Sequence, residues 1–349
     1  MINRALLLTL ILFSCGLFLN FYSDKTSKIQ TIEQELSSSG VEQVLLELGA
    51  IKKESHYLEK VDLAQAELGK QLVFSGRAIR NGKKSKLIST YFMCTDCHNM
   101  VAETPKLSDI SSASRLVYSK ANNLPFMPGS PFYGIYNRNS FYNDDYVKKY
   151  GSLVDDARHD LRRSIQVCAK YCSSGRYLVD WEQEAILHYY KSNELKIKDL
   201  QLDASILSEL SASKSMSSDE KLALGKKIQG TFPAKYAATF LETMDRNLRK
   251  YGAGGNVENG KTIYEESCLF CHADSRVTYL NIDKTQLTAK FFWKNIKNYT
   301  DQNLYQILRH GTYAKSGRRQ YMPMYTEEKM SDEQINDLVA YVKQLAKVK

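Results

Sequence analysis

Apolar side chains recur at the three- to four-residue spacing of amphipathic helices in several parts of this chain. The runs lie at residues 62–73, 153–170, 181–190 and 331–348, and each places its apolar residues on one face. A stripe of this kind has to be buried against another element. The pattern therefore predicts an all-α protein built from packed amphipathic helices.

Two of the predicted helices share a short pattern around a glycine. Gly69 lies in Glu67-Leu68-Gly69-Lys70, and Gly260 lies in Glu258-Asn259-Gly260-Lys261. A glycine inside a helix allows another backbone to approach closely. We expect each glycine to mark a close crossing with the last helix of its own domain, which indicates an internal duplication.

Helix-start signals fix the beginnings of the two closing helices. Ser331 and Gln334 form a capping-box pattern, and Asp180 and Gln183 form a similar one. A third start is expected at Ser217. These signals predict closing helices from 181 and from 331, and another helix in the segment between the domains.

Polar stretches divide the chain, which is long enough at 349 residues for two domains with separate cores. We assign the parts in order: 1–22 as a signal or anchor segment, 23–60 as a tether or lead-in helix, 61–192 as the first domain, 193–255 as a connecting segment, and 256–349 as the second domain.

The N-terminal segment is a targeting or anchoring signal. Arg4 precedes an apolar run from Ala5 to about Tyr22. Within it, Leu12-Phe13-Ser14-Cys15-Gly16 is similar to a lipobox, which would make Cys15 a lipidated residue. The run is also long enough for an uncleaved spanning helix. Both alternatives place the domains on the outer, periplasmic side of a membrane, tethered to it.

The strongest chemical signal is a Cys-x-x-Cys-His motif that occurs twice, as 94–98 and as 268–272. This pattern is typical of covalent c-type haem attachment. The two thiols of each motif add to the haem vinyl groups, and the histidine binds the iron. The sequence therefore predicts two covalently bound haem c groups, held by Cys94, Cys97 and His98 and by Cys268, Cys271 and His272.

Two further cysteines and the net charge bear on ligands and partners. Cys168 and Cys172 lie outside the motifs, and in an oxidising compartment they could form a disulfide. The net charge is +9, which favours acidic redox partner proteins, both donor and acceptor. No nucleic-acid-binding motif is visible.

Each iron needs a sixth ligand, and for the second haem a methionine loop supplies one. Tyr321-Met322-Pro323-Met324 lies directly before the closing helix. It resembles the axial methionine loop of class I cytochromes c, so the resemblance implies two tandem class I cytochrome c domains with Met322 on the second iron. Met324 is the alternative.

The first domain has no such loop before its closing helix. The segment 163–168, followed by Gly175 and Arg176, resembles the cysteine-ligand region of thiosulfate dehydrogenases and related sulfur-oxidising cytochromes. The resemblance implies Cys168 as sixth ligand of the first haem and a possible catalytic residue. Cys172 and Met127 are the alternatives, and neither cysteine can bind iron within a disulfide.

Three function classes follow from these features. A dihaem cytochrome that transfers electrons outside the cytoplasm needs only the two haem motifs. An enzyme similar to thiosulfate dehydrogenase would oxidise a sulfur anion at a His/Cys haem, where Arg162, Arg163 or Arg176 could bind a haem propionate or the anion. A redox subunit of a respiratory complex is favoured by the membrane anchor.

Overall fold

The computed structural model describes residues 36–300, 302–312 and 321–347. The segment 1–22, with Cys15, lies outside these ranges, so the tether and the periplasmic location stay predictions from the sequence. Among the helices that the structure describes, none combines the length and the apolar character needed to cross a bilayer.

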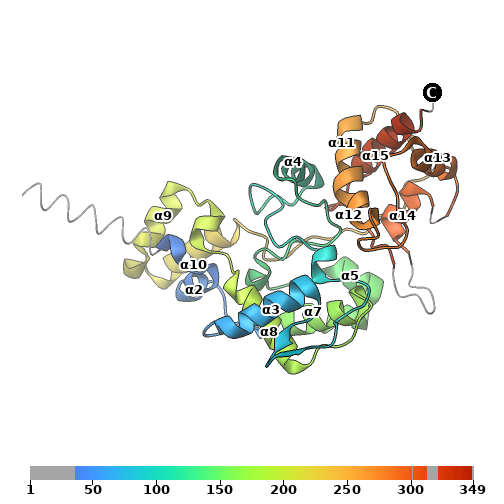
Figure 1. The fold of residues 1–349 in the computed structure, drawn as a ribbon. Helices are drawn as coiled ribbons and strands as arrows, with labels where there is room; N and C mark the ends of the chain where they lie inside the picture. Colours follow the sequence, from blue (N-terminus) through green and yellow to red (C-terminus); the bar gives the residue numbers. More distant parts are fainter. Residues whose placement is uncertain (1–35, 301, 313–320, 348–349) are drawn as a thin grey trace, which may run out of the picture. The chain divides into compact units, whose positions relative to one another are not determined.

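About half of the described residues are helical, and the only strands among them form one short antiparallel hairpin, β1 (Ile79–Arg80) with β2 (Lys83–Lys84). The all-α prediction is confirmed at this level (Figure 1). The chain separates into two compact units.

The smaller unit includes residues 36–52 and 195–228. It holds α2 (Val41–Glu47), η4 (Ile197–Leu200), α9 (Ala204–Ser211), η5 (Ser213–Ser215) and α10 (Ser218–Gln229). The two stretches are joined by backbone hydrogen bonds, Val41 N–H to the Leu195 carbonyl at 2.9 Å and Ile197 N–H to the Ser39 carbonyl at 3.0 Å. Part of the predicted tether and part of the connecting segment thus fold together.

The larger unit holds residues 53–194, here called the first half, and residues from 229 onward, the second half. The first half contains α3 (Leu63–Ser75), η1 (Cys94–Asp96), α4 (Ser112–Asn122), η2 (Ile135–Asn137), α5 (Asp144–Tyr150), α6 (Ser152–Asp155), α7 (Leu161–Val167), the π-helical turn η3 (Cys168–Cys172) and α8 (Asp180–Ser192). The second half contains α11 (Val257–Ile263), the π-helical turn η6 (Tyr264–Cys268), α12 (Leu269–His272), α13 (Gln286–Asn295), α14 (Leu304–His310) and α15 (Asp332–Leu345).

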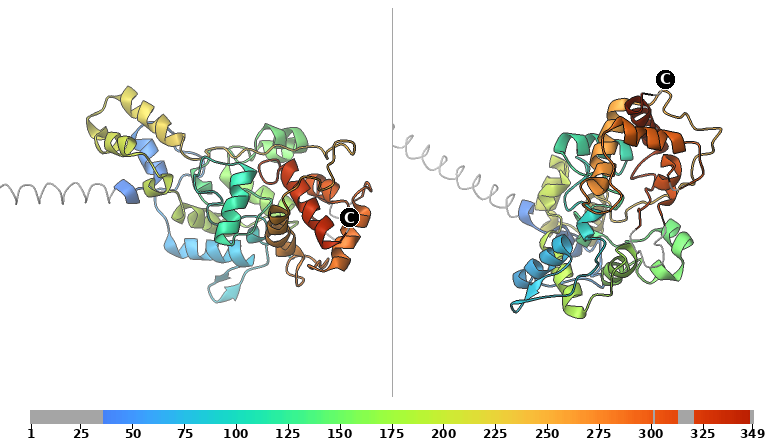
Figure 2. Two further views of the ribbon diagram at one scale, coloured as in Figure 1. Left: turned by 90° about the horizontal axis from the view of Figure 1, so that it is seen from above. Right: turned by 45° about the vertical axis from the view of Figure 1, so that its right-hand side comes forward.

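Each half is built on a close crossing of its first and last helix. Helix α3 packs against α8, and α11 packs against α15, as Figures 1 and 2 show from several directions. A Cβ added at Gly69 would lie 2.0 Å from the Ala185 carbonyl oxygen, and one at Gly260 would lie 2.0 Å from that of Asp337. Any larger side chain would force the helices apart. The crossings predicted from the two glycines are confirmed.

Two local predictions are wrong. The helix expected over 153–170 is broken, because the Asp160 carboxylate caps a new helix by accepting a hydrogen bond from Arg163 N–H. Helix α8 does not begin with an Asp180 cap: Val179 is the capping residue, and its N–H donates to the Glu182 carboxylate at 3.2 Å. The start at Ser331 is confirmed, with hydrogen bonds exchanged between Ser331 and Gln334.

The two halves share a core. Leu116 of α4 and Phe126 are buried in one apolar cluster with Ile263, Leu338 and other residues of the second half. The Gln334 side chain donates to the Ser112 carbonyl at 2.8 Å. The segment after the first Cys-x-x-Cys-His motif therefore packs on the second half and brings the two motifs into one unit.

Candidate haem sites

The first motif forms a tight turn that is held at both ends. The Asp96 carboxylate accepts from Met93 N–H at 2.7 Å, and His98 N–H donates to the Cys94 carbonyl at 3.1 Å. Burial raises the pKa of the Cys94 thiol to about 12. The turn offers two protonated thiols and one imidazole from five consecutive residues.

The His98 imidazole is fixed from behind. Its Nδ1 lies 2.6 Å from the Ser130 carbonyl oxygen, and its ring stacks on Phe132 with centroids 4.0 Å apart. A Cβ at Gly129 would lie 2.5 Å from the His98 ring, so only glycine fits there. Burial lowers the pKa of His98 to about 4, which keeps the ring neutral.

His272 in the second motif has the same arrangement. Its Nδ1 lies 2.8 Å from the Leu280 carbonyl oxygen, and burial lowers its pKa. A carbonyl oxygen can only accept, so Nδ1 carries the proton in both rings and Nε2 keeps its lone pair. This is how a metal-binding histidine is commonly oriented. Both motifs therefore fit a haem iron at Nε2.

The two motifs lie next to each other within the larger unit. A strap of residues 125–129 bonds to the first motif and to the turn before the second. Gly129 N–H donates to the Cys97 carbonyl, and Phe126 N–H donates to the carbonyl of Glu266, two residues before Cys268, each at 2.9 Å. Burial raises the pKa of the Cys97 thiol, and the Cys271 thiol of the second motif adds to the rise.

The methionine loop of the second half distinguishes Met322 from Met324. Met322 packs against the apolar cluster of the second half, which Cys268 also contacts. Its backbone exchanges hydrogen bonds with Thr312: Met322 N–H donates to the hydroxyl at 2.7 Å, and Thr312 N–H donates to the Met322 carbonyl at 3.0 Å. The Met324 sulfur instead faces the Tyr150 hydroxyl at 3.9 Å.

Cys168 and Cys172 lie one turn apart in η3 and are free thiols. The Cys168 thiol donates a hydrogen bond to Cys172, which raises the pKa of Cys168 and lowers that of Cys172. The neighbouring Cys94 and Cys97 thiols also contribute to the raised pKa of Cys168. The pair thus lies beside the first motif. No disulfide joins it in this structure.

Three tyrosines that were not predicted as site residues lie near this thiol pair. Burial raises the pKa of Tyr142, Tyr146 and Tyr321, and the nearby Cys172 raises each of them further. The Tyr321 hydroxyl also donates to the Cys172 carbonyl. Such tyrosines carry no sequence signal of their own, because solvent-exposed and buried tyrosines look alike in a sequence.

Met127, the other alternative for the first iron, is buried in the strap. Its carbonyl accepts from the Arg115 guanidinium at 3.0 Å. The same strap supports His98 through Gly129. Met127 is therefore held by the segment that backs the His98 imidazole, whereas the thiol pair comes from a separate element.

The arginines near the thiol pair and the histidines outside the two motifs have hydrogen-bond or ion-pair partners within the protein. Arg162 pairs with Glu184, and Arg176 pairs with Glu182, both at 2.6 Å. These ion pairs remove two of the three arginines expected to be available for an anion. The remaining histidines bond to backbone groups or to an acidic side chain, namely His56, His159, His188 and His310.

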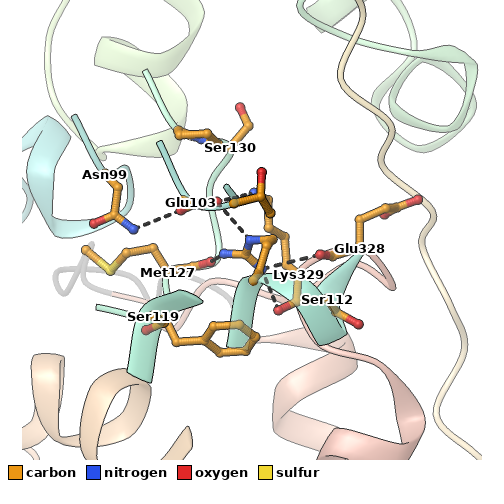
Figure 3. A network of polar contacts seen from close by, with 12 residues as sticks. Asn99, Glu103, Ser112, Ser119, Met127, Ser130, Glu328 and Lys329 are labelled. Carbon is orange, nitrogen blue, oxygen red and sulfur yellow. Dashed lines mark hydrogen bonds and ion pairs between the residues drawn. The ribbon is translucent and has the colours of Figure 1, made fainter. Parts of the chain in front are cut away.

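The structure also contains a buried ionic cluster that the sequence did not predict. Glu103, Arg115 and Lys329 meet with side chains almost fully enclosed. Figure 3 shows Glu103 and Lys329 within this network. Glu103 lies shortly after the first motif, and Lys329 lies between Met322 and α15. No local pattern separates such residues from solvated charges, because their partners are distant in the sequence.

Comparison with known proteins bears on the second half. A family model described as Cytochrome C oxidase, cbb3-type, subunit III matches residues 255–342, about a quarter of the chain. No curated protein and no solved structure matches the chain. The matched range includes the second Cys-x-x-Cys-His motif, Met322 and most of α15. Residues 255–342 are therefore a c-type cytochrome domain, which implies covalently bound haem c and a role in electron transfer.

Proposed function

We propose that this chain is a dihaem c-type cytochrome that transfers electrons between redox partner proteins. The first haem would be held by Cys94, Cys97 and His98, and the second by Cys268, Cys271 and His272. Met322 would bind the second iron from the other side. Each haem c supplies a site that takes up and releases one electron.

The observation that carries the proposal is the matched setting of the two histidines. His98 and His272 each donate Nδ1–H to a backbone carbonyl, at 2.6 and 2.8 Å. The family match covers only the second of them. Since the first imidazole is oriented in the same way beside its own pair of thiols, it is equally prepared to bind an iron.

The test is a count of bound haem. Protein produced with a c-type maturation system should give a pyridine haemochrome signal for two haems per polypeptide. Replacing Cys94 and Cys97 by alanine should reduce the count to one, as should replacing Cys268 and Cys271. A count of one in the unmodified protein would contradict the first site.

We further propose that acidic partners dock beside the second motif. Tyr279, Leu280 and Leu287 are 90%, 64% and 80% exposed, and Leu280 is the residue whose carbonyl holds His272. Exposed lysines accompany them on and after α13: Lys290, Lys294 and Lys297. An apolar patch with a basic rim favours a partner with an acidic rim, because opposite charges speed the encounter.

Ionic strength tests this docking surface. The rate of electron exchange with a small acidic redox protein should fall as salt rises, since salt screens exposed charges over about 8 Å at physiological strength. The rate with a small uncharged reductant should stay constant and serves as the control. A salt-independent rate with the acidic protein would contradict the proposal.

A second candidate function is oxidation of a sulfur anion at the first haem. The observation that favours it is the free thiol pair of η3 beside the first motif, which could provide the thiolate ligand implied by the resemblance to sulfur-oxidising cytochromes. The pairing of Arg162 and Arg176 with glutamates leaves fewer cations for an anionic substrate. Electron transfer without a substrate is therefore the better supported function.

A further inference from the structure

A buried cluster of charges links the second half to the first haem site. One carboxylate oxygen of Glu103 lies 2.8 Å from Arg115 Nε and 3.1 Å from Lys329 Nζ. The side chains are almost fully buried: Glu103 is 5% exposed, Arg115 1% and Lys329 3%. Glu328, half-buried nearby, directs its carboxylate to Thr239 instead. With Lys329 protonated, the cluster thus carries two positive charges and one negative charge.

The carboxylate of this cluster is tied to the first motif. Glu103 accepts from the Asn99 side chain at 2.8 Å, and Asn99 directly follows His98. Figure 3 shows Asn99 and Glu103 pointing toward each other, with Lys329 on the other side of the carboxylate. Burial of His98 leaves it sensitive to these charges: Lys329 lowers the pKa of its imidazole, and Glu103 raises it.

A third cation reaches the same imidazole from another element. The Arg138 guanidinium donates to the Ser130 hydroxyl at 3.2 Å, and Ser130 supplies the carbonyl that orients His98. The Tyr236 ring lies 5.0 Å from the Arg138 guanidinium and 4.5 Å from Lys329 Nζ. Positive charge therefore exceeds negative charge in the enclosed region behind His98.

Buried charges act strongly on one another because little water screens them. An iron that gains one electron becomes less positive, so a nearby cation stabilises the ferrous form and a nearby carboxylate stabilises the ferric form. The charges are fixed by hydrogen bonds and ion pairs before the electron arrives, so reduction does not require them to rearrange.

We propose that Lys329, contributed by the second half, raises the reduction potential of the first haem, and that Glu103 lowers it. The inference rests on the proposed first haem site. The reaction concerned is a one-electron reduction of iron by an external reductant, in which no bond is made or broken. Lys329 and Glu103 are potential-setting residues and do not contact the iron ligands.

Two substitutions separate charge from structure. Lys329→Met removes a positive charge and Glu103→Gln removes a negative one, yet both break the same ion pair. Burial, and then the nearby Arg115, lower the pKa of Lys329 to about 7. At pH 6 the lysine is therefore charged. At a fixed ambient potential, the ratio of ferrous to ferric iron in the first haem should fall about tenfold in Lys329→Met. This is the effect of removing a charge about 10 Å away at an effective dielectric constant of about 20.

Because Glu103 raises the pKa of Lys329, the Glu103→Gln variant and the unmodified protein are compared at pH 5, where Glu103→Gln should move that ratio in the opposite direction by a similar factor. Lys329→Arg keeps the positive charge and should keep the ratio of the unmodified protein. A tenfold change corresponds to about 59 mV for a one-electron couple. The readout is a potentiometric titration followed by electron paramagnetic resonance, which separates the two haems. Lys120→Met, an exposed charge removed from α4, is the matched control and should leave both potentials unchanged.

The outcomes are distinct. Opposite shifts at the first haem support the inference. No shift, or shifts in the same direction, with two haems bound would overturn it. If one variant loses the first haem, the potential of the other variant alone tests the inference. Loss of the first haem from both variants would also overturn the inference, because the cluster would then be needed only to build the site. A single haem in the unmodified protein would instead overturn the proposed function.

Discussion

Replacing Met322 by alanine is expected to lower the reduction potential of the second haem by at least about 0.1 V, since axial ligands spread haem potentials over about 0.8 V. A thioether ligand favours ferrous iron, so its loss favours the ferric form. Potentiometric titration measures the change, and the absorption spectrum of the oxidised protein should change with it. The first haem should keep its potential.

Met324→Ala is the matched control, because it removes the same side chain two residues away. The Met324 sulfur faces the Tyr150 hydroxyl, so its loss should leave the second haem close to its original potential. The opposite result, with Met324→Ala lowering the potential and Met322→Ala leaving it unchanged, would transfer the ligand to Met324.

The backbone around Met322 explains why the ligand is expected to be well fixed. Gly311 adopts a left-handed conformation with φ of 62°, and a Cβ there would lie 2.3 Å from the Met322 carbonyl oxygen. The Thr312 backbone and hydroxyl bond to the same residue. The sequence Gly311-Thr312 thus positions the methionine loop from the end of α14.

Features that depend on neighbouring residues could be predicted from the sequence. The Ser331 cap of α15 is made by hydrogen bonds across three residues, and the Asp62 cap of α3 is made in the same way. The glycine crossings were predicted because a glycine within a helical pattern has few other uses. The haem motifs were visible because their chemistry needs a fixed spacing of five residues.

Features that depend on distant residues could not be predicted. Glu103 and Lys329 are 226 positions apart, and nothing in either neighbourhood indicates that they pair. Likewise, the smaller unit joins residues near 40 with residues near 196. The local cap at Asp180 failed for a related reason: Glu182 already accepts from Val179 N–H and pairs with Arg176, so the helix begins one residue earlier.

Replacing Cys168 by alanine is expected to raise the potential of the first haem by at least about 0.1 V, within the range over which axial ligands act. A thiolate donates negative charge to the iron and stabilises the ferric form, so its removal has the opposite effect to the loss of Met322. Electron paramagnetic resonance of the oxidised protein should show the change in ligand set. The second haem should be unaffected.

Cys172→Ala is the matched control for Cys168→Ala. Cys168 is partly enclosed, whereas Cys172 is exposed and its carbonyl is bonded to Tyr321. We therefore expect Cys172→Ala to remove the hydrogen bond between the thiols but to keep the ligand signature. If Cys172→Ala alone changes the signature, Cys172 is the ligand. If neither does and Met127→Ala does, the strap methionine binds the first iron, and the sulfur-oxidation candidate loses its thiolate.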